Sequence, residues 1–317
     1  MPAPKWTAND VPDQTGKVAI VTGANSGLGF ETTRGLARKN ATVIMACRDL
    51  KKGQAALEKI KKELPNANVE LMQLDLADLD SIRHFTEDFK QRYSRLDLLV
   101  NNAGIMAIPY RQTKQGFEMQ FGTNHLGHFA LTGLLLPVML ETPGQPRVVT
   151  TSSGLHMIGD LNFADLNWSK GYTPQKAYGR SKLSNLLFTY ELQRRLDAQG
   201  DKILSVASHP GYAATNLQTA GAIMEGKKFR ERMSLLMNSI FAQSAEMGAL
   251  PTLYASTAPD VKSGQYFGPS GLLEMRGYPK AVDSNKKSND PELAAKLWAV
   301  SEELTGVNFS KSLVGQR

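Results

Sequence analysis

The chain has 317 residues, of which 41% are apolar and 21% are charged. This length and balance suit a folded protein of one large or two small domains, and they argue against a disordered chain. The formal net charge is +7, but Lys and Arg are spread along the chain and form no basic stripe with interleaved aromatics. We therefore expect no nucleic-acid partner.

The sequence shows no sign of secretion or of membrane insertion. A single cysteine, Cys47, cannot form an internal disulfide, which fits a reducing compartment. The start of the chain, "MPAPKWTANDVPDQ", is polar and unlike a signal peptide. The apolar stretch 129–140 is too short for a transmembrane helix and contains Thr, Gly and Pro. We expect a cytoplasmic protein without a transmembrane segment.

Up to residue 211 the chain alternates short apolar stretches with longer amphipathic ones. We predict strands at 17–22, 41–47, 69–76, 96–104, 147–153 and 202–211, and helices at 29–40, 50–64, 79–93 and 176–199. Strands alternating with helices form βαβ units, which predicts an α/β fold with a Rossmann-type, doubly wound parallel sheet. The strands are continuously apolar, as expected where helices cover both faces of the sheet.

No repeat or linker divides the sequence, so we expect a single domain over residues 1–317. The Met-rich stretch 217–247 is predicted to be a helical insertion that covers the substrate as a lid. A C-terminal helix is predicted over 290–306, between an Asp-Pro start and a Gly stop.

A glycine-rich turn, "TGANSGLG" at 22–29, lies between the first predicted strand and the first helix. In a βαβ unit this pattern predicts a dinucleotide site, although a glycine-rich turn without a ligand is the alternative. Its glycines would allow a tight turn, close approach of a pyrophosphate and close packing of helix on strand, and the helix N-terminus would offer N–H groups. The candidate cofactor-binding residues here are Gly23, Asn25, Ser26, Gly27, Leu28 and Gly29.

The end of the second strand indicates which dinucleotide is bound. Cys47 stands where an NAD enzyme usually has an acidic residue for the ribose, and Arg48 follows it. A guanidinium suits the 2′-phosphate of NADP(H), which we expect as the cofactor. Asp49 keeps NAD(H) open as the alternative, because it could pair with Arg48 or hold the ribose itself.

Several motifs occur in an order and approximate spacing that are typical of one family. They are "TGANSGLG", "NNAG" (101–104), Asn124, "TTSS" (150–153), "YGRSK" (178–182) and "HPG" (209–211). On these motifs the chain resembles the short-chain dehydrogenases/reductases over about residues 15–215. Four further stretches resemble the corresponding sequences of the subgroup of retinol dehydrogenases and protochlorophyllide reductases: "VIMACRD", "LDLADLDSIR", "TNHLGHF" and "YGRSKLSNLLF". The sequence of the predicted C-terminal helix resembles that subgroup too.

This resemblance implies a catalytic tetrad and further contacts with the cofactor. The tetrad would be Asn124, Ser153, Tyr178 and Lys182, with Ser152 as a neighbouring candidate. The implied cofactor contacts beyond the glycine turn and Arg48 are Asp75, Leu76, Asn102, Ala103, Gly104, Tyr178, Lys182, Pro210, Gly211 and Thr215.

Tyr178 and Lys182 are four residues apart, which places them on one face of the predicted helix. A nearby ammonium favours a phenolate, so we expect Lys182 to lower the pKa of Tyr178 from its ordinary ~10 and to tune it for proton transfer. Ser153 would hydrogen-bond the carbonyl oxygen of a substrate, and Asn124 would hold a water that relays protons to Lys182. Residues 179–181 are expected to be spacers.

Together these features predict an NADPH-dependent enzyme that transfers hydride between nicotinamide and a carbonyl compound or alcohol with an apolar body. The alternatives are a retinol dehydrogenase-like or protochlorophyllide reductase-like enzyme, and a non-catalytic dinucleotide-binding regulator. His125 and His128 suggest no metal site, because no third ligand accompanies them. His156 and His209 are candidates for lining the substrate pocket. The expected partner is a small molecule, and a homo-oligomer stays open.

Overall fold

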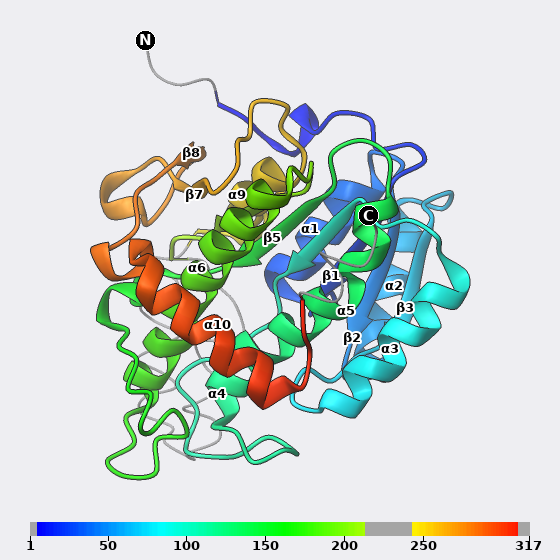
Figure 1. Cartoon of the computed structure of the whole chain (residues 1–317). Coiled ribbons are helices and arrows are strands. Elements are labelled where there is room, and N and C mark those ends of the chain that lie inside the picture. The colour runs from blue at the N-terminus through cyan, green and yellow to red at the C-terminus, as the bar shows by residue number, and fades with distance from the viewer. Residues whose placement is uncertain (1–4, 213–242, 310–317) are drawn as a thin grey trace, which may run out of the picture.

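The computed structural model of the protein describes residues 5–212 and 243–309. The strands in this part are Val18–Thr22 (β1), Thr42–Cys47 (β2), Val69–Gln73 (β3), Leu98–Asn101 (β4), Arg147–Thr151 (β5), Leu204–Ser208 (β6), Tyr266–Pro269 (β7) and Pro279–Ala281 (β8). They form one sheet in the order β3-β2-β1-β4-β5-β6-β7-β8, in which only the β7–β8 pair is antiparallel (Figure 1). The chain winds outward from β1 in both directions, which confirms the predicted doubly wound fold.

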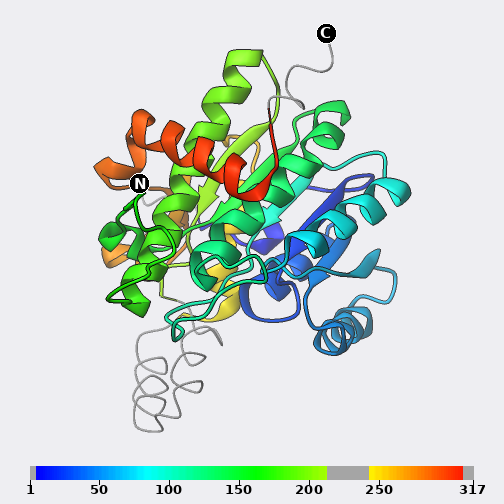
Figure 2. The same cartoon turned by 60° about the horizontal axis from the view of Figure 1, so that its bottom comes forward.

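Helices cover both faces of this sheet (Figures 1 and 2). One face carries helices α1, α2 and α9, whose residues Leu36, Ile60 and Leu253 pack with the apolar residues of β1 and β2. The other face carries α3, α5, α6 and α10, which bury a cluster that includes Phe129 and Trp298. The bounds of the helices are Gly27–Ala37 (α1), Leu50–Glu63 (α2), Leu79–Arg92 (α3), Met119–Phe121 (α4), Gly127–Glu141 (α5), Pro174–Gln199 (α6), Ala245–Thr257 (α9) and Pro291–Thr305 (α10), with a π-helical turn at Gly122–Leu126 (η2) and 3₁₀ turns at Ala8–Asp10 (η1), Gly154–Ile158 (η3), Leu272–Glu274 (η4) and Lys286–Asn289 (η5).

Several strands end earlier than predicted, and the difference falls at one edge of the sheet. β3, β4, β5 and β6 end at Gln73, Asn101, Thr151 and Ser208, between two and three residues before the predicted ends. The residues beyond them include Gly and Pro, which do not continue a strand ladder well. They leave the sheet at its carboxyl edge as loops, which is where ligands bind in doubly wound sheets.

The C-terminal helix is confirmed with its predicted start and stop. The Asp290 carboxylate accepts hydrogen bonds from the backbone N–H groups of Glu292 and Leu293, and Gly306 ends the helix with a φ of 64°. The helix is docked on α6 through Trp298, which stacks on Phe188 with ring centroids 5.8 Å apart. Local capping signals and burial therefore agree at this end of the fold.

Most of the predicted lid, residues 217–242, lies outside the described residues. Its last part, 243–247, is described: Gln243 and Ser244 precede the core helix α9, and residues 245–247 begin it, which corrects the predicted boundary. Ser244 caps the N-terminus of α9 by accepting a hydrogen bond from Met247 N–H, and Met247 packs against the core beside α1. Within residues 5–212 and 243–309, no helix has both the length and the apolar character needed to cross a membrane.

Candidate active site

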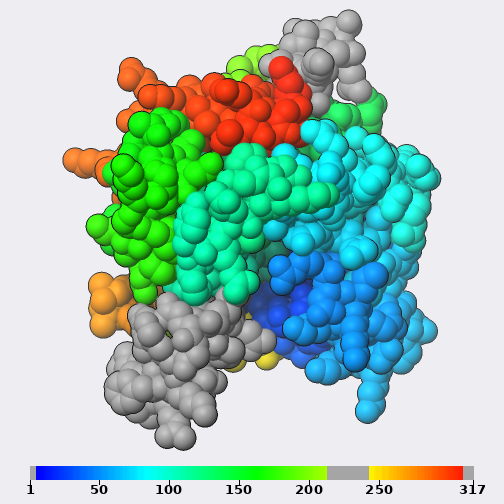
Figure 3. All heavy atoms as spheres, turned by 90° about the horizontal axis from the view of Figure 1, so that it is seen from below, coloured from blue at the N-terminus to red at the C-terminus, as the bar shows by residue number. Residues whose placement is uncertain are grey.

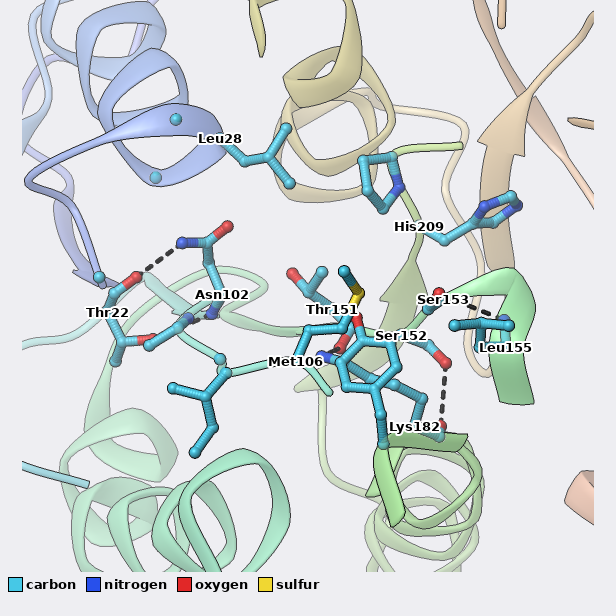
Figure 4. A pocket seen from close by; sticks show the side chains of 18 of the residues that line it. Thr22, Leu28, Asn102, Met106, Thr151, Ser152, Ser153, Leu155, Lys182 and His209 are labelled. Carbon is cyan, nitrogen blue, oxygen red and sulfur yellow. Dashed lines mark hydrogen bonds between the residues drawn. The ribbon is translucent and has the colours of Figure 1, made fainter. Parts of the chain in front are cut away.

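A cavity of about 730 Å³ opens at the carboxyl edge of the sheet. From below, the molecular surface is hollowed between the blue N-terminal segments and the green segments of the middle of the chain (Figure 3). Leu28, Thr22 and Asn102 lie on one side of the cavity, and Ser152, Ser153 and Lys182 lie on the other (Figure 4). The predicted cofactor-binding residues that line it are Gly23, Asn25, Ser26, Gly27, Leu28, Gly29, Arg48, Asp75, Leu76, Asn102, Ala103, Gly104, Tyr178, Lys182, Pro210 and Gly211.

Among the predicted cofactor and catalytic residues that the structure describes, Asn124 is the one that does not line this cavity. Thr215 lies outside the described residues. Asn124 stands behind the wall of the cavity, where a side chain at Gly104 would meet its Oδ1 atom at 3.2 Å and the Lys182 Nζ atom at 3.6 Å. The predicted cofactor and catalytic residues that the structure describes therefore converge on this cavity, apart from Asn124.

The glycine turn at residues 22–29, called the glycine cradle below, has a backbone that a phosphate group can approach closely. Gly23 has a φ of 67°, a conformation that favours glycine, and a Cβ atom there would lie 3.0 Å from the Cα atom of Ala103. A Cβ atom at Gly29 would overlap the Gly23 carbonyl and lie 2.6 Å from Asn102 Nδ2. Ser26 starts α1 without a side-chain cap, so the first backbone N–H groups of the helix have no such partner at the cavity. These features fit the pyrophosphate of a dinucleotide.

The end of β2 presents a cation to the cavity. The Asp49 carboxylate caps α2 by accepting a hydrogen bond from Lys52 N–H at 3.0 Å, and Arg48 lines the cavity. Cys47 is buried, and this burial raises the pKa of its thiol to about 11. The structure thus gives Asp49 a role that was not predicted, as a helix cap, and the cationic side chain that lines the cavity at this point is Arg48.

The loop after β4 is fixed by Thr22 at the end of β1. The Thr22 Oγ1 atom accepts hydrogen bonds from the backbone N–H groups of Asn102 and Ala103, each at 2.9 Å. It also contacts His128 Nε2 at 3.0 Å, while His128 Nδ1 lies 2.9 Å from the Asn124 carbonyl oxygen. Because a carbonyl can only accept, Nδ1 carries the proton and Nε2 accepts from Thr22. Burial lowers the pKa of His128 to about 4, so it is neutral at pH 7.

Asn124 uses its side chain to hold neighbouring protein groups. Its Nδ2 atom donates to the Ile105 carbonyl and to Ser181 Oγ, each at 2.9 Å, and its Oδ1 atom accepts from Ile105 N–H at 2.9 Å. Both protons of the amide are thus engaged. In the structure Asn124 fixes the loop at Ile105 and the helix at Ser181, and a water relay to Lys182 stays a prediction.

The two serines at the end of β5 have different surroundings. Ser152 Oγ donates to the Lys182 carbonyl oxygen at 2.9 Å, and its side chain is buried (Figure 4). The Ser153 side chain interacts with the Tyr178 phenol and accepts a hydrogen bond from Leu155 N–H at 3.2 Å. Ser152 therefore ties β5 to α6, while Ser153 faces Tyr178 in the cavity, as a role at the substrate carbonyl requires.

The expected lowering of the Tyr178 pKa by Lys182 is not what the structure gives. Burial raises the pKa of Tyr178 to about 12, and the interaction with Ser153 only partly opposes this. Burial also lowers the pKa of Lys182 to about 8. The Lys182 Nζ atom donates to the Thr151 carbonyl at 3.0 Å and lies 5.5 Å from the centre of the Tyr178 ring. Desolvation is the dominant cause of the shift, so Tyr178 is a neutral phenol at pH 7.

Residue 180, expected to be a spacer, anchors the segment before α6. The buried Arg180 guanidinium donates to the carbonyl oxygens of Asp160, Asp165 and Leu166 at 3.0–3.1 Å. It also stacks on Trp168, with its central carbon 4.0 Å from the ring centre. Arg180 therefore holds together a loop that has little other regular structure.

The other two expected spacers have contacts of their own. A Cβ atom at Gly179 would lie 2.8 Å from the Leu155 carbonyl, so glycine lets η3 approach α6 closely. Ser181 Oγ donates to the Tyr178 carbonyl at 2.8 Å and accepts from Asn124. The spacer prediction is thus wrong for all three residues, because every face of this part of α6 is buried.

The two candidate histidines of the substrate pocket differ. His209 lines the cavity, whereas His156 lies behind Ser153. The His156 Nδ1 atom donates to the Ser153 carbonyl at 2.7 Å, and its Nε2 atom accepts from Asn285 N–H at 3.2 Å. Sequence reasoning missed several lining residues, because most come from loops that carry no motif: Thr22, Ala46, Leu74, Ile105, Met106, Ala107, Thr123, Thr151, Gly154, Leu155, Gln175, Tyr212, Leu273, Glu274 and Met275.

The doubly wound sheet, the glycine cradle and the Ser153–Tyr178–Lys182 cluster define a dinucleotide-binding protein with groups placed for proton transfer. Comparison with known proteins agrees. The family model described as short chain dehydrogenase matches residues 17–225. Human retinol dehydrogenase 13 is 42% identical over 92% of this chain and 85% of that protein. Mouse polyprenol dehydrogenase is 39% identical over 95% of this chain and 88% of that protein.

A solved structure supports the same assignment. The crystal structure of an uncharacterized protein from Mycobacterium Paratuberculosis superposes with a TM-score of 0.80 and 45% identity, over 96% of this chain and 99% of that one. The chain belongs to the short-chain dehydrogenase/reductase family, in its retinol dehydrogenase-like subgroup. It is therefore an oxidoreductase of a family that uses a nicotinamide cofactor.

Proposed function

We propose that the protein is an NADPH-dependent oxidoreductase that interconverts a ketone or aldehyde and the corresponding alcohol. The observation that carries this proposal is that one cavity holds the glycine cradle, Arg48 and the Ser153–Tyr178–Lys182 cluster. Two relatives are named for retinol and polyprenol, which supports an alcohol or carbonyl group as the reacting group of the substrate.

When bound, the nicotinamide cofactor supplies hydride to the carbonyl carbon or takes it from the alcohol carbon. The chain supplies the proton. In carbonyl reduction the Tyr178 phenol donates its proton to the carbonyl oxygen, and the Ser153 hydroxyl hydrogen-bonds the same oxygen as charge develops on it. The Lys182 ammonium then stabilises the phenolate that is left. Oxidation of the alcohol runs the same steps backwards, with the phenolate as the base.

NADPH is proposed over NADH because of the charges at the end of β2. Arg48 is the cation that lines the cavity there, and Asp49 is engaged as a helix cap. Arg48→Ala should raise the KM for NADPH about tenfold, worth about 1.4 kcal/mol, and leave the KM for NADH nearly unchanged. Lys51→Ala, an exposed cation in the first turn of α2, is the matched control and should change neither. An equal effect of the two variants on NADPH would contradict the role of Arg48.

The activity itself is tested by following NADPH absorbance with a panel of apolar ketones and aldehydes. We expect oxidation of NADPH that depends on the carbonyl compound. Tight binding of NADPH without turnover of any member of the panel would favour the alternative, a non-catalytic dinucleotide-binding regulator.

A further inference from the structure

The 3₁₀ turn η4, between β7 and β8, brings an acidic side chain to the cavity. Leu273 and Glu274 both adopt left-handed backbone conformations, with φ of 51° and 55°. For residues other than glycine, this conformation costs roughly 1–3 kcal/mol each, and it persists only where the surrounding structure stabilises it. Here it occurs at two consecutive residues. Leu272 and Leu273 are 87% and 81% exposed, so apolar burial does not explain the conformation. Leu273 and Glu274 both line the cavity, and Glu274 brings a charged side chain to it.

His209 holds the carboxylate of Glu274 in a defined direction. The backbone N–H of Gly211 donates to His209 Nδ1 at 3.2 Å, so this nitrogen is unprotonated. The proton is therefore on Nε2, which donates to Glu274 Oε2 at 3.1 Å. His209 is 3% exposed, and burial lowers its pKa to about 4, so it stays neutral at pH 7.

Neighbouring residues fix the position of the His209 imidazole. Its ring packs on Tyr266 with centroids 5.1 Å apart, and any side chain at Gly268 would overlap it. Burial raises the pKa of Glu274. The charge of Lys280 lowers this pKa, and the charge of Asp283 raises it. An exposed turn that served only as a connection would not need a clamped, neutral histidine to orient its carboxylate.

The carboxylate lies at the reacting end of the cavity. His209 comes directly after β6 and lies on the side of the cavity that carries Ser153 (Figure 4). A Cβ atom at Gly211 would lie 2.7 Å from the Glu274 carbonyl, so the turn packs against the segment that follows His209. The glycine cradle and Arg48 are on the opposite wall. The charge of Glu274 therefore acts on the substrate end of the cavity.

We propose that Glu274, positioned by His209, is a specificity-determining residue that accepts a hydrogen bond from a hydroxyl or ammonium group of the substrate and disfavours a carboxylate there. This inference rests on the proposed carbonyl reduction. It adds a polar group to a substrate whose body is predicted from the sequence to be apolar. A buried or half-buried carboxylate discriminates most strongly between substrates that differ in charge at one position.

The test uses full-length protein, NADPH and four aldehydes that differ only in one substituent. They are para-methylbenzaldehyde, para-(hydroxymethyl)benzaldehyde, para-(dimethylaminomethyl)benzaldehyde, which is cationic at pH 7, and para-formylbenzoate. For the wild type we expect kcat/KM for the cationic aldehyde to exceed that for the anionic one by about 100-fold, with the neutral pair between them. Glu274→Gln should reduce this ratio to about threefold or less and leave the methyl compound within about twofold.

A matched variant separates a local contact from general charge. Asp283→Asn removes the same charge from an exposed position near Glu274 and should keep most of the wild-type ratio. A structural role of Glu274 alone would lower kcat/KM for all four aldehydes together. That result, or an unchanged ratio in Glu274→Gln, or equal effects of both variants, would overturn the inference while turnover shows that the proposed function stands. Failure of the wild type to reduce any of the four would overturn both.

Discussion

The two walls of the cavity differ in the chemical groups that they present. The cofactor wall, defined here as the β1–α1 turn, Arg48 and the loop after β4, offers mainly backbone groups and glycines. The catalytic wall, defined as the end of β5 and the first half of α6, uses side chains that are almost all buried. The cofactor wall therefore leaves little room for added side chains. The role of each residue of the catalytic wall depends instead on which neighbour its side chain contacts.

The largest expected effect separates two adjacent serines of the catalytic wall. Ser153→Ala should lower kcat at least about 100-fold, because it removes a hydrogen bond to the oxygen where charge develops. Ser152→Ala should change kcat by less than about threefold and cost about 1 kcal/mol of unfolding free energy, since its hydroxyl ties β5 to the Lys182 carbonyl and also interacts with the buried Tyr266 phenol. Steady-state kinetics and denaturant unfolding of both variants measure this. Equal losses of kcat would contradict the division of roles.

On the cofactor wall the corresponding test adds a single methyl group. Gly29→Ala should weaken NADPH binding roughly 10- to 100-fold, because its Cβ atom would collide with the Gly23 carbonyl. Gly154→Ala is the control on the other wall, where an added Cβ meets no atom within 4 Å, and it should bind NADPH within about twofold of the wild type. Fluorescence titration with NADPH gives both dissociation constants. Unchanged binding in Gly29→Ala would mean that this turn does not hold the cofactor.

The catalytic wall should also carry a cost in stability. Burial lowers the pKa of Lys182 from 10.5 to about 8, so below pH 8 the folded state contains a buried charge that the unfolded state solvates freely. This depression corresponds to about 3 kcal/mol, partly offset by the hydrogen bond to Thr151. Lys182→Met should therefore raise the unfolding free energy at pH 7 by about 2 kcal/mol while it abolishes most activity.

The sign of this effect with pH provides its check. Between pH 8 and about 10.5 the unfolded state holds the Lys182 proton and the folded state does not, so the wild type gains stability relative to Lys182→Met as pH rises through this window. Denaturant unfolding of both proteins at pH 7 and pH 10 measures the difference. A wild type that is more stable than the variant at pH 7 would contradict the account.

The sequence predicted the cofactor wall more completely than the catalytic one. This wall contains two local sequence patterns, the glycine turn between strand and helix and the Cys47-Arg48 pair. Such local patterns predict a binding site without knowledge of the tertiary packing. The Tyr178–Lys182 spacing was readable too, but its electrostatics were not, because burial depends on everything packed around α6. Arg180 was misjudged for the same reason: its partners are backbone carbonyls of a loop up to twenty residues away in sequence.

The alternation of strands and helices was enough to predict the doubly wound sheet, while the ends of its strands were not. The motifs after Asn101 and Ser208, "NAG" and "HPG", were included in the predicted strands, but the paired registers with the neighbouring parallel strands end at Asn101 and Ser208. Glu274 could not be found at all by pattern, because it lies in a short turn without a motif and reaches the cavity only through the pairing of β6 with β7. Long-range packing thus decided the features that sequence reasoning missed.

One NADPH molecule is proposed to contact both walls of the cavity. A crystal structure with NADP⁺ bound would show whether it does. We expect the pyrophosphate at the Gly23–Gly29 turn, the 2′-phosphate against Arg48 and the nicotinamide beside Tyr178. A dinucleotide bound outside this cavity, or bound with its adenine end at Ser153 and Tyr178, would contradict this proposal.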